Sequence, residues 1–178
     1  MSNNIAIGKL FGLEISAKPN ALFWALVLWV VLSAIAFYVV RLPFLDSLFG
    51  GLVGVILHYV SEVAHHLGHA GAARSTGYPM RGMRFWGLIA SSLYPKDEPP
   101  LPAQIHIRRA LGGPTISFVV TVIALLILLA VRNGGGLTFW LALWFFLDNL
   151  LVFFLGAFLP LSFTDGGTLV KYWGSRSS

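Results

Sequence analysis

The chain has 178 residues, of which 57% are hydrophobic and only 11% are charged, and it contains no cysteine. This composition lies outside the range of soluble globular domains, and it excludes both a disulfide framework and a thiolate metal site. The net charge of +5 is typical of a surface that faces anionic lipid headgroups, so it does not indicate a nucleic-acid partner. We therefore expect an integral membrane protein in contact with the lipid bilayer.

The residue pattern along the chain predicts a strand-like N-terminal segment followed by four membrane spans. Residues 1–20 contain IAIGKLFGLEISA (5–17), whose β-branched residues and glycines predict one or two short strands. Four apolar stretches then follow, each long enough to cross about 30 Å of hydrocarbon: about 21–40, 49–73, 110–131 and 137–159. Between the second and third, STGYPMRGMRFWGLIASSLYP (75–95) has the turn residues and broken apolar run of small strands.

These elements predict a mainly α fold, a polytopic membrane helical bundle of four spans with a small β element on the cytoplasmic side. The whole chain, 1–178, is expected to form a single integral-membrane core with no separate soluble domain. In the fourth span, Asp148 and Asn149 interrupt an aromatic run. Because polar groups in a span are costly in lipid, both are expected to face protein or water.

Basic residues are distributed unevenly between the two sides that alternating spans create. One side receives only Arg41 and Arg132. The other receives Lys9, Lys18, Arg74, Arg81, Arg84, Lys96, Arg108, Arg109, Lys171 and Arg176. Because cytoplasmic loops carry the excess of lysine and arginine, we expect both termini and the 71–109 loop in the cytoplasm.

The second predicted span contains a cluster of ionisable residues, SEVAHHLGHA (61–70). At about 100° per residue, His58, Glu62, His65 and His69 share one stripe of the helix. Ionisable groups within a span normally face a bundle interior or a wet cavity that contains a partner. His65 and His69, at positions i and i+4, can present two imidazoles to one cation. Ordinary hydrogen-bonded histidines are the simpler alternative, which we favour for His58 and His106.

A third candidate ligand is Asp165, in LPLSFTDGG (159–167). The second and fourth spans run in the same direction, so the histidine pair and Asp165 meet at the same membrane face. Pro160 breaks the preceding helix, and two glycines after Asp165 let the backbone turn sharply. A lone Asp-Gly pair usually marks a turn, but opposite a histidine pair it becomes a candidate metal ligand.

With these motifs in order, the chain resembles the site-2 protease family of intramembrane zinc metalloproteases over nearly its whole length. The segments that carry the resemblance are IGKLFGLEI with KPN, HHLGHAGAARSTGYPMRGMRFWGLIASS, RRALGGPTIS and FLPLSFTDGG. The resemblance implies one zinc ion per chain, held by His65, His69 and Asp165 with water in the fourth position. It also implies a transmembrane protein as substrate or as partner subunit.

Two positions depart from the family pattern where hydrolysis is concerned. The family has a glutamate after the first histidine, acting as general base, and this chain has His66. An asparagine is common eight residues before the aspartate and a proline three residues before it, and here Ala157 and Ser162 stand at these positions. Whether the chain is an active zinc metalloendopeptidase is therefore left open.

Three explanations fit these departures. His66 could itself act as the catalytic base, or Glu62 could substitute, although it lies about 6 Å further along the helix axis. The third explanation, which we favour, is a catalytically impaired homologue that retains the metal site and binds a membrane partner or substrate, for example as a subunit of a larger complex. A more remote alternative is a haem or chlorophyll-type pigment on His58 or His66, for which the sequence specifies no porphyrin site.

Overall fold

Four helical spans, each long and apolar enough to cross a membrane, dominate the computed structural model, which describes residues 4–174. They cover Asn20–Val39, Phe44–Ser75, Ala103–Val131 and Gly136–Phe158. Large apolar side chains project outward from them, and Leu22 and Leu126 are 78% and 61% exposed. Such an apolar surface suits the hydrocarbon core of a bilayer. The helical backbone also suits it, because its hydrogen bonds are satisfied within each helix. The prediction of an integral membrane bundle is confirmed.

Two of the four spans are uninterrupted α-helices, and the other two contain segments of different helical type. The first consists of α1 (Asn20–Ala34) and a π-helical segment, η1 (Ile35–Val39). The second and third are the continuous helices α2 (Phe44–Ser75) and α3 (Ala103–Val131). The fourth consists of α4 (Gly136–Asp148), the π-helical η2 (Asn149–Leu155) and the short 3₁₀ turn η3 (Gly156–Phe158). Prolines immediately precede α2 and α3, where a missing N–H costs the helix nothing.

The predicted strands form one small sheet. Strands β1 (Ile5–Leu10), β2 (Leu13–Ala17), β3 (Gly82–Phe85) and β4 (Ala90–Leu93) lie in the order β1-β2-β3-β4. The β2–β3 pair is parallel, whereas β1–β2 and β3–β4 are antiparallel. One face packs on α2 through a core of Leu13, Ala21, Ala73, Met80, Met83 and Phe85. This packing leaves β4 as an edge strand beside the helix bundle.

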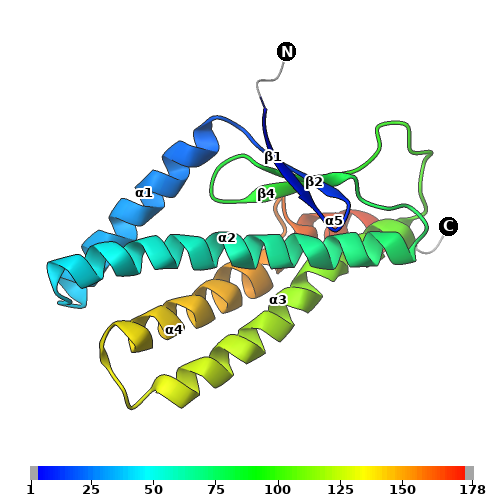
Figure 1. The fold of residues 1–178 in the computed structure, drawn as a ribbon. Helices are drawn as coiled ribbons and strands as arrows, with labels where there is room; N and C mark the ends of the chain where they lie inside the picture. Colours follow the sequence, from blue (N-terminus) through cyan, green and yellow to red (C-terminus); the bar gives the residue numbers. More distant parts are fainter. Residues whose placement is uncertain (1–3, 175–178) are drawn as a thin grey trace.

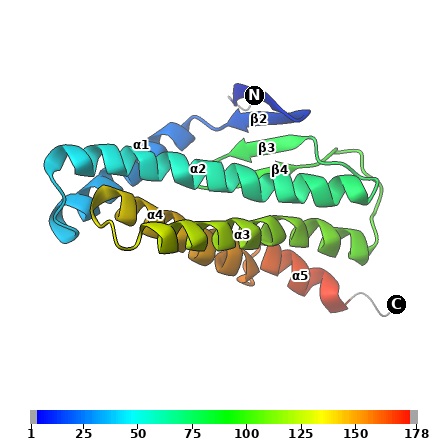
Figure 2. The same cartoon turned by 60° about the horizontal axis from the view of Figure 1, so that its bottom comes forward.

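Helix α2 is the central element of the fold (Figure 1). The sheet lies on one side of it and α3 on the other, with α5 (Asp165–Trp173) beside α3 (Figure 2). The backbones of α2 and α3 are in contact at Gly68 and Gly112, where a Cβ on Gly68 would lie 2.3 Å from the Gly112 carbonyl oxygen. The two glycines therefore permit a close helix crossing, which brings α3 against the histidine face of α2.

Candidate metal centre

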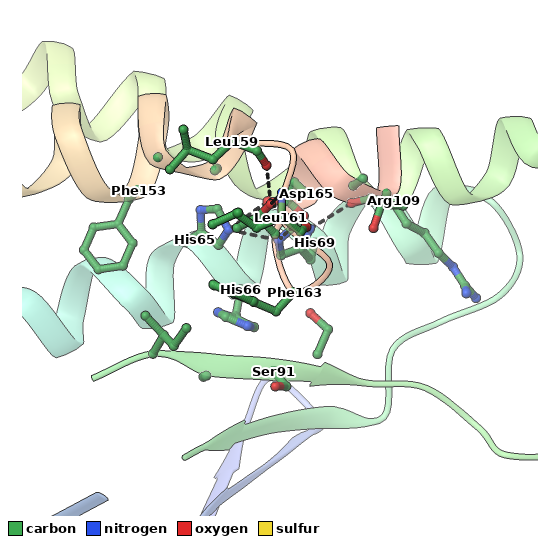
Figure 3. Close-up of a pocket in the computed structure, with 18 of the residues that line it drawn as sticks. His65, His66, His69, Ser91, Arg109, Phe153, Leu159, Leu161, Phe163 and Asp165 are labelled. Carbon is green, nitrogen blue, oxygen red and sulfur yellow. Dashed lines mark hydrogen bonds and ion pairs between the residues drawn. The ribbon is translucent and has the colours of Figure 1, made fainter. Parts of the chain in front are cut away.

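Three side chains from two elements converge between α2, α3 and α5. The Nε2 atoms of His65 and His69 lie 3.0 Å apart. Asp165 Oδ2 lies 3.3 Å from His65 Nε2, and Asp165 Oδ1 lies 3.4 Å from His69 Nε2. Figure 3 shows the three side chains pointing toward one another. The structure thus brings together the three residues that the sequence suggested as ligands.

Both imidazoles are oriented by α3 through their other ring nitrogen. His65 Nδ1 lies 2.9 Å from the hydroxyl oxygen of Ser117, and His69 Nδ1 donates to the Arg109 carbonyl at 2.8 Å. A ligating histidine characteristically makes such a bond from its non-ligating nitrogen, which fixes the ring and the tautomer. Sequence reasoning missed these two partners, although both lie in or next to the RRALGGPTIS segment.

Gly113 provides the space in which the two rings sit. A Cβ at this position would lie 2.4 Å from His69 Nε2 and 2.5 Å from His65 Nε2. Any side chain at position 113 would therefore displace both nitrogens. Because glycine has none, α3 leaves a cradle, which is the space that the two imidazole rings occupy.

Asp165 is the first residue of α5 rather than part of a sharp turn. Thr164 caps this helix by accepting a hydrogen bond from the Gly167 N–H at 3.4 Å. The expectation that the two glycines allow a tight turn needs correction, because both lie in the first turn of the helix. They allow a close approach instead, since a Cβ on Gly166 would lie 2.2 Å from the Phe158 carbonyl oxygen.

The charge state of Asp165 suits a ligand. Burial raises the pKa of this carboxyl, but hydrogen bonds and charge from His65 and His69 lower it to about 2. The carboxylate is therefore ionised at neutral pH and faces two imidazole nitrogens.

The three side chains fit a zinc ion. Nitrogen and oxygen ligands bind zinc at about 2.0–2.1 Å, so two of them in a tetrahedral arrangement lie about 3.3 Å apart. The two imidazole nitrogens lie 3.0 Å apart, and each of them lies 3.3 or 3.4 Å from a different carboxylate oxygen of Asp165. One ligand atom from each of the three residues can be chosen so that all three lie within 4.8 Å of one another, which is compatible with a shared metal ion. Two imidazoles and one carboxylate are also ligand types that zinc accepts.

His66 and Glu62 lie on the sheet side of the histidine pair. The His66 ring centroid is 5.6 Å from those of His65 and His69, and His66 Nδ1 lies 3.1 Å from the Glu62 carbonyl oxygen. The Glu62 carboxylate accepts the Ala90 N–H of β4 and lies 3.7 Å from His66 Nδ1. The stripe predicted from helical periodicity therefore divides: His65 and His69 face Asp165, whereas Glu62 faces β4.

The two remaining histidines lie outside the metal cluster. His58 is hydrogen-bonded to the Asp148 carboxylate at 3.1 Å and to the Leu88 carbonyl at 2.8 Å. His106 stacks on the Tyr172 ring with centroids 4.1 Å apart. Both have the ordinary packed environments that the simpler alternative expects. Asp148 is buried within the protein, as the cost of a lipid-exposed carboxylate requires.

A pocket of about 740 Å³ opens beside the metal cluster. Residues of β4 line it opposite His65 and His69, and segment 151–165 contributes a third wall. Three carboxylates line the pocket: Asp165, Glu62 and Glu98. The buried guanidinium of Arg109 holds Glu98 through two hydrogen bonds of 2.6 and 3.0 Å. Each of these carboxylates therefore has a partner within the chain.

These features define an integral membrane protein with a candidate His/His/Asp metal centre. No family model matches the chain. Over 126 residues it is 32% identical to the "Putative zinc metalloprotease sll0528" of Synechocystis sp., a match that covers 67% of this chain and 31% of that protein. The chain thus spans less than a third of this relative's length.

The structural comparison extends over nearly the whole chain. The fold matches the Site-2 Protease from Methanocaldococcus jannaschii with a TM-score of 0.64 and 20% identity, covering 98% of this chain and 73% of that one. The chain therefore has the site-2 protease fold. The sequence similarity to the putative zinc metalloprotease and this fold agree with the resemblance that the sequence motifs indicated.

Proposed function

We propose that the chain is a membrane metalloprotein that holds one zinc ion on His65, His69 and Asp165. We further propose that it binds an extended segment of a membrane protein beside β4, and that its capacity for peptide hydrolysis is strongly reduced. The similarity to a putative zinc metalloprotease and the convergence of the three side chains support the metal. A zinc ion in this position supplies Lewis-acid polarisation of a peptide carbonyl.

One observation carries the proposal of reduced hydrolysis: every carboxylate that lines the pocket is directed toward a partner within the chain. Asp165 faces the two imidazoles, Glu62 accepts the Ala90 N–H, and Glu98 is held by Arg109. Hydrolysis needs a general base within hydrogen-bond reach of the attacking water. These bonds direct the Glu62 carboxylate toward β4 and the Glu98 carboxylate toward Arg109, so neither is oriented toward the histidine pair.

Ala157 supports the same conclusion. It lines the pocket and its methyl group offers no hydrogen-bond donor. In the family that the chain resembles, an asparagine is common at this position. Removing a donor of this kind from a hydrolase typically costs about 10²–10³ in rate, and removing a general base about 10²–10⁴.

A second candidate function is active proteolysis with His66 as the base. The observation that favours it is the tautomer of His66, whose Nδ1 donates to the Glu62 carbonyl at 3.1 Å and leaves Nε2 as the acceptor. An imidazole in this form keeps the unprotonated nitrogen that a general base requires. The two candidates share the metal centre and differ in the rate of peptide cleavage.

The docking surface that we propose is the free edge of β4. It is an edge strand that lines the pocket opposite the histidine pair. Edge strands bind extended peptides by adding a strand to the sheet. A membrane protein segment that unwinds near its end could pair there with its backbone close to the metal centre.

Cleavage of a synthetic transmembrane peptide tests the proposal. The comparison uses the unmodified protein, His66→Glu, Ala157→Asn and the double variant, with zinc content measured for each. We expect cleavage by the unmodified protein to be at least about a hundredfold slower than by an active relative. We expect His66→Glu to repair it only in part, and the double variant to exceed either single one.

Efficient cleavage by the unmodified protein would contradict reduced hydrolysis. Its loss in His66→Ala would then assign His66 as the base. Its loss in Glu62→Gln, with His66→Ala still active, would assign Glu62 instead.

A further inference from the structure

The free edge of β4 is partly covered by side chains of α2. The Trp86 N–H donates to the Ile89 carbonyl across the β3–β4 turn, so Ile89 faces β3. Backbone groups of successive strand residues point to opposite edges. Leu88, Ala90 and Ser92 therefore present their N–H and C=O groups to the free edge, toward α2 and the pocket.

Two side chains of α2 occupy the first part of this edge. His58 Nε2 donates to the Leu88 carbonyl at 2.8 Å, and the Glu62 carboxylate accepts the Ala90 N–H. Both side chains are buried, with 4% and 3% of their residue surface exposed. Beyond them, the Ala90 carbonyl and the backbone groups of Ser92 meet no backbone partner among residues 4–174.

We call His58 and Glu62 the two caps of the β4 edge. Their spacing follows from the similar rise of four helix residues and two strand residues. Four residues of an α-helix advance about 6 Å, and two residues of a strand advance about 6.6 Å. His58 and Glu62 are four residues apart on α2, and the groups that they bind, on Leu88 and Ala90, are two residues apart. The next pair in this series is His66 and Ser92, both of which line the pocket.

His58 is itself held in place from the opposite side. Its Nδ1 lies 3.1 and 3.2 Å from the two carboxylate oxygens of Asp148, which is 3% exposed. The buried pair links α2 to the end of α4, so the ring that caps Leu88 has little freedom to move away. The first cap is thus a rigid part of the bundle.

We infer that His58 and Glu62 are positioning residues that close the edge of β4 as far as the Ala90 N–H, so that an added peptide strand pairs only from the Ala90 carbonyl onward. This inference rests on the proposed docking of a membrane protein segment at β4. It limits the register, because no partner residue can pair before the Ala90 carbonyl, and the partner residue that pairs with Ser92 then lies beside His66. It also gives Glu62 a role other than that of a general base.

The cysteine-free chain allows this register to be mapped by disulfide cross-linking. The probe is a synthetic peptide with a leucine-rich transmembrane helix and an extended threonine–valine segment that carries one cysteine. With Glu62 intact, we expect cross-links to Ser92→Cys and at least tenfold weaker cross-links to Ile89→Cys. Adding Glu62→Ala should free the Ala90 N–H and raise the yield at Ile89→Cys.

Glu62→Gln is the matched control, because its amide oxygen still accepts the Ala90 N–H. It should leave the cross-linking pattern unchanged. In the peptide-free protein, hydrogen exchange at the Ala90 amide should become about tenfold faster in Glu62→Ala but not in Glu62→Gln, as expected for the loss of one buried hydrogen bond.

Equal cross-linking of Ile89→Cys and Ser92→Cys in the protein with native Glu62 would overturn the inferred register. So would Glu62→Gln behaving like Glu62→Ala in both measurements. If the probe cross-links at neither position while the exchange results are as expected, the cap exists but the proposed docking at β4 is wrong.

Discussion

Gly113 lies so close to His69 that a Cβ on it would be 2.4 Å from the Nε2 atom of the imidazole. The same Cβ would lie 2.5 Å from His65 Nε2. One missing side chain on α3 therefore sets the position of two rings on α2.

The first prediction concerns this cradle. Gly113→Ala should reduce zinc affinity at least tenfold, because the methyl group displaces both imidazole nitrogens from the positions that they hold beside Asp165. Overpacking of this kind should also lower the free energy of unfolding by about 1–3 kcal/mol. Gly71→Ala, on α2 with open space around its Cβ, is the control and should bind zinc normally. Normal zinc affinity in Gly113→Ala would show that the rings do not need this space.

A second prediction concerns Ser117, whose hydroxyl lies 2.9 Å from His65 Nδ1. Ser117→Ala removes the bond that orients this ring, so zinc affinity should fall about 10–100-fold. Thr115→Ala is a suitable control, because the exposed Thr115 hydroxyl bonds only to the Leu111 carbonyl of its own helix. Competition with a fluorescent zinc chelator measures both affinities. Equal zinc affinities for the two variants would show that the Ser117 hydroxyl does not contribute to zinc binding.

A third prediction concerns the buried pair of His58 and Asp148. Asp148→Ala leaves the imidazole without its partner, so the free energy of unfolding in detergent should fall by about 3 kcal/mol or more. Asp148→Asn keeps an oxygen acceptor and should cost about 1 kcal/mol. If Asn were as destabilising as Ala, the hydrogen bond to His58 would not be the source of the stability.

The architecture followed from the sequence because its signals are local. Apolar length predicts the four spans, and the glycine-rich segments 5–17 and 75–95 predict the strands. The sequence did not predict where two of the helices begin: α2 begins at Phe44 rather than at 49, and α3 begins at Ala103 rather than at 110. Proline before each of these residues starts the helix well ahead of the apolar stretch.

The candidate site was only partly predictable. His65, His69 and Asp165 were suggested by residue type and by the direction of the spans, which are properties of the sequence alone. The contacts of Glu62 and His58 with β4, and of Ser117 with His65, depend on how the sheet and α3 pack against α2. Helical periodicity placed Glu62 and His58 on the stripe of the ligands, because it contains no information on which neighbour each side chain meets.

A fourth prediction concerns membrane orientation. The excess of basic residues on one side places Ser75 in the cytoplasm and Asn133 outside. In intact cells, a membrane-impermeant thiol reagent should therefore label Asn133→Cys but not Ser75→Cys, and the absence of native cysteine removes background. Labelling of Ser75→Cys alone would reverse the orientation.

The most direct test of the account is the zinc content of the purified protein, prepared without chelator and measured by elemental analysis. We expect one zinc ion per chain, and strongly reduced zinc content in His65→Ala and Asp165→Ala variants that remain folded in detergent. Protein without zinc, or zinc content unchanged by both substitutions, would contradict a metal centre formed by His65, His69 and Asp165.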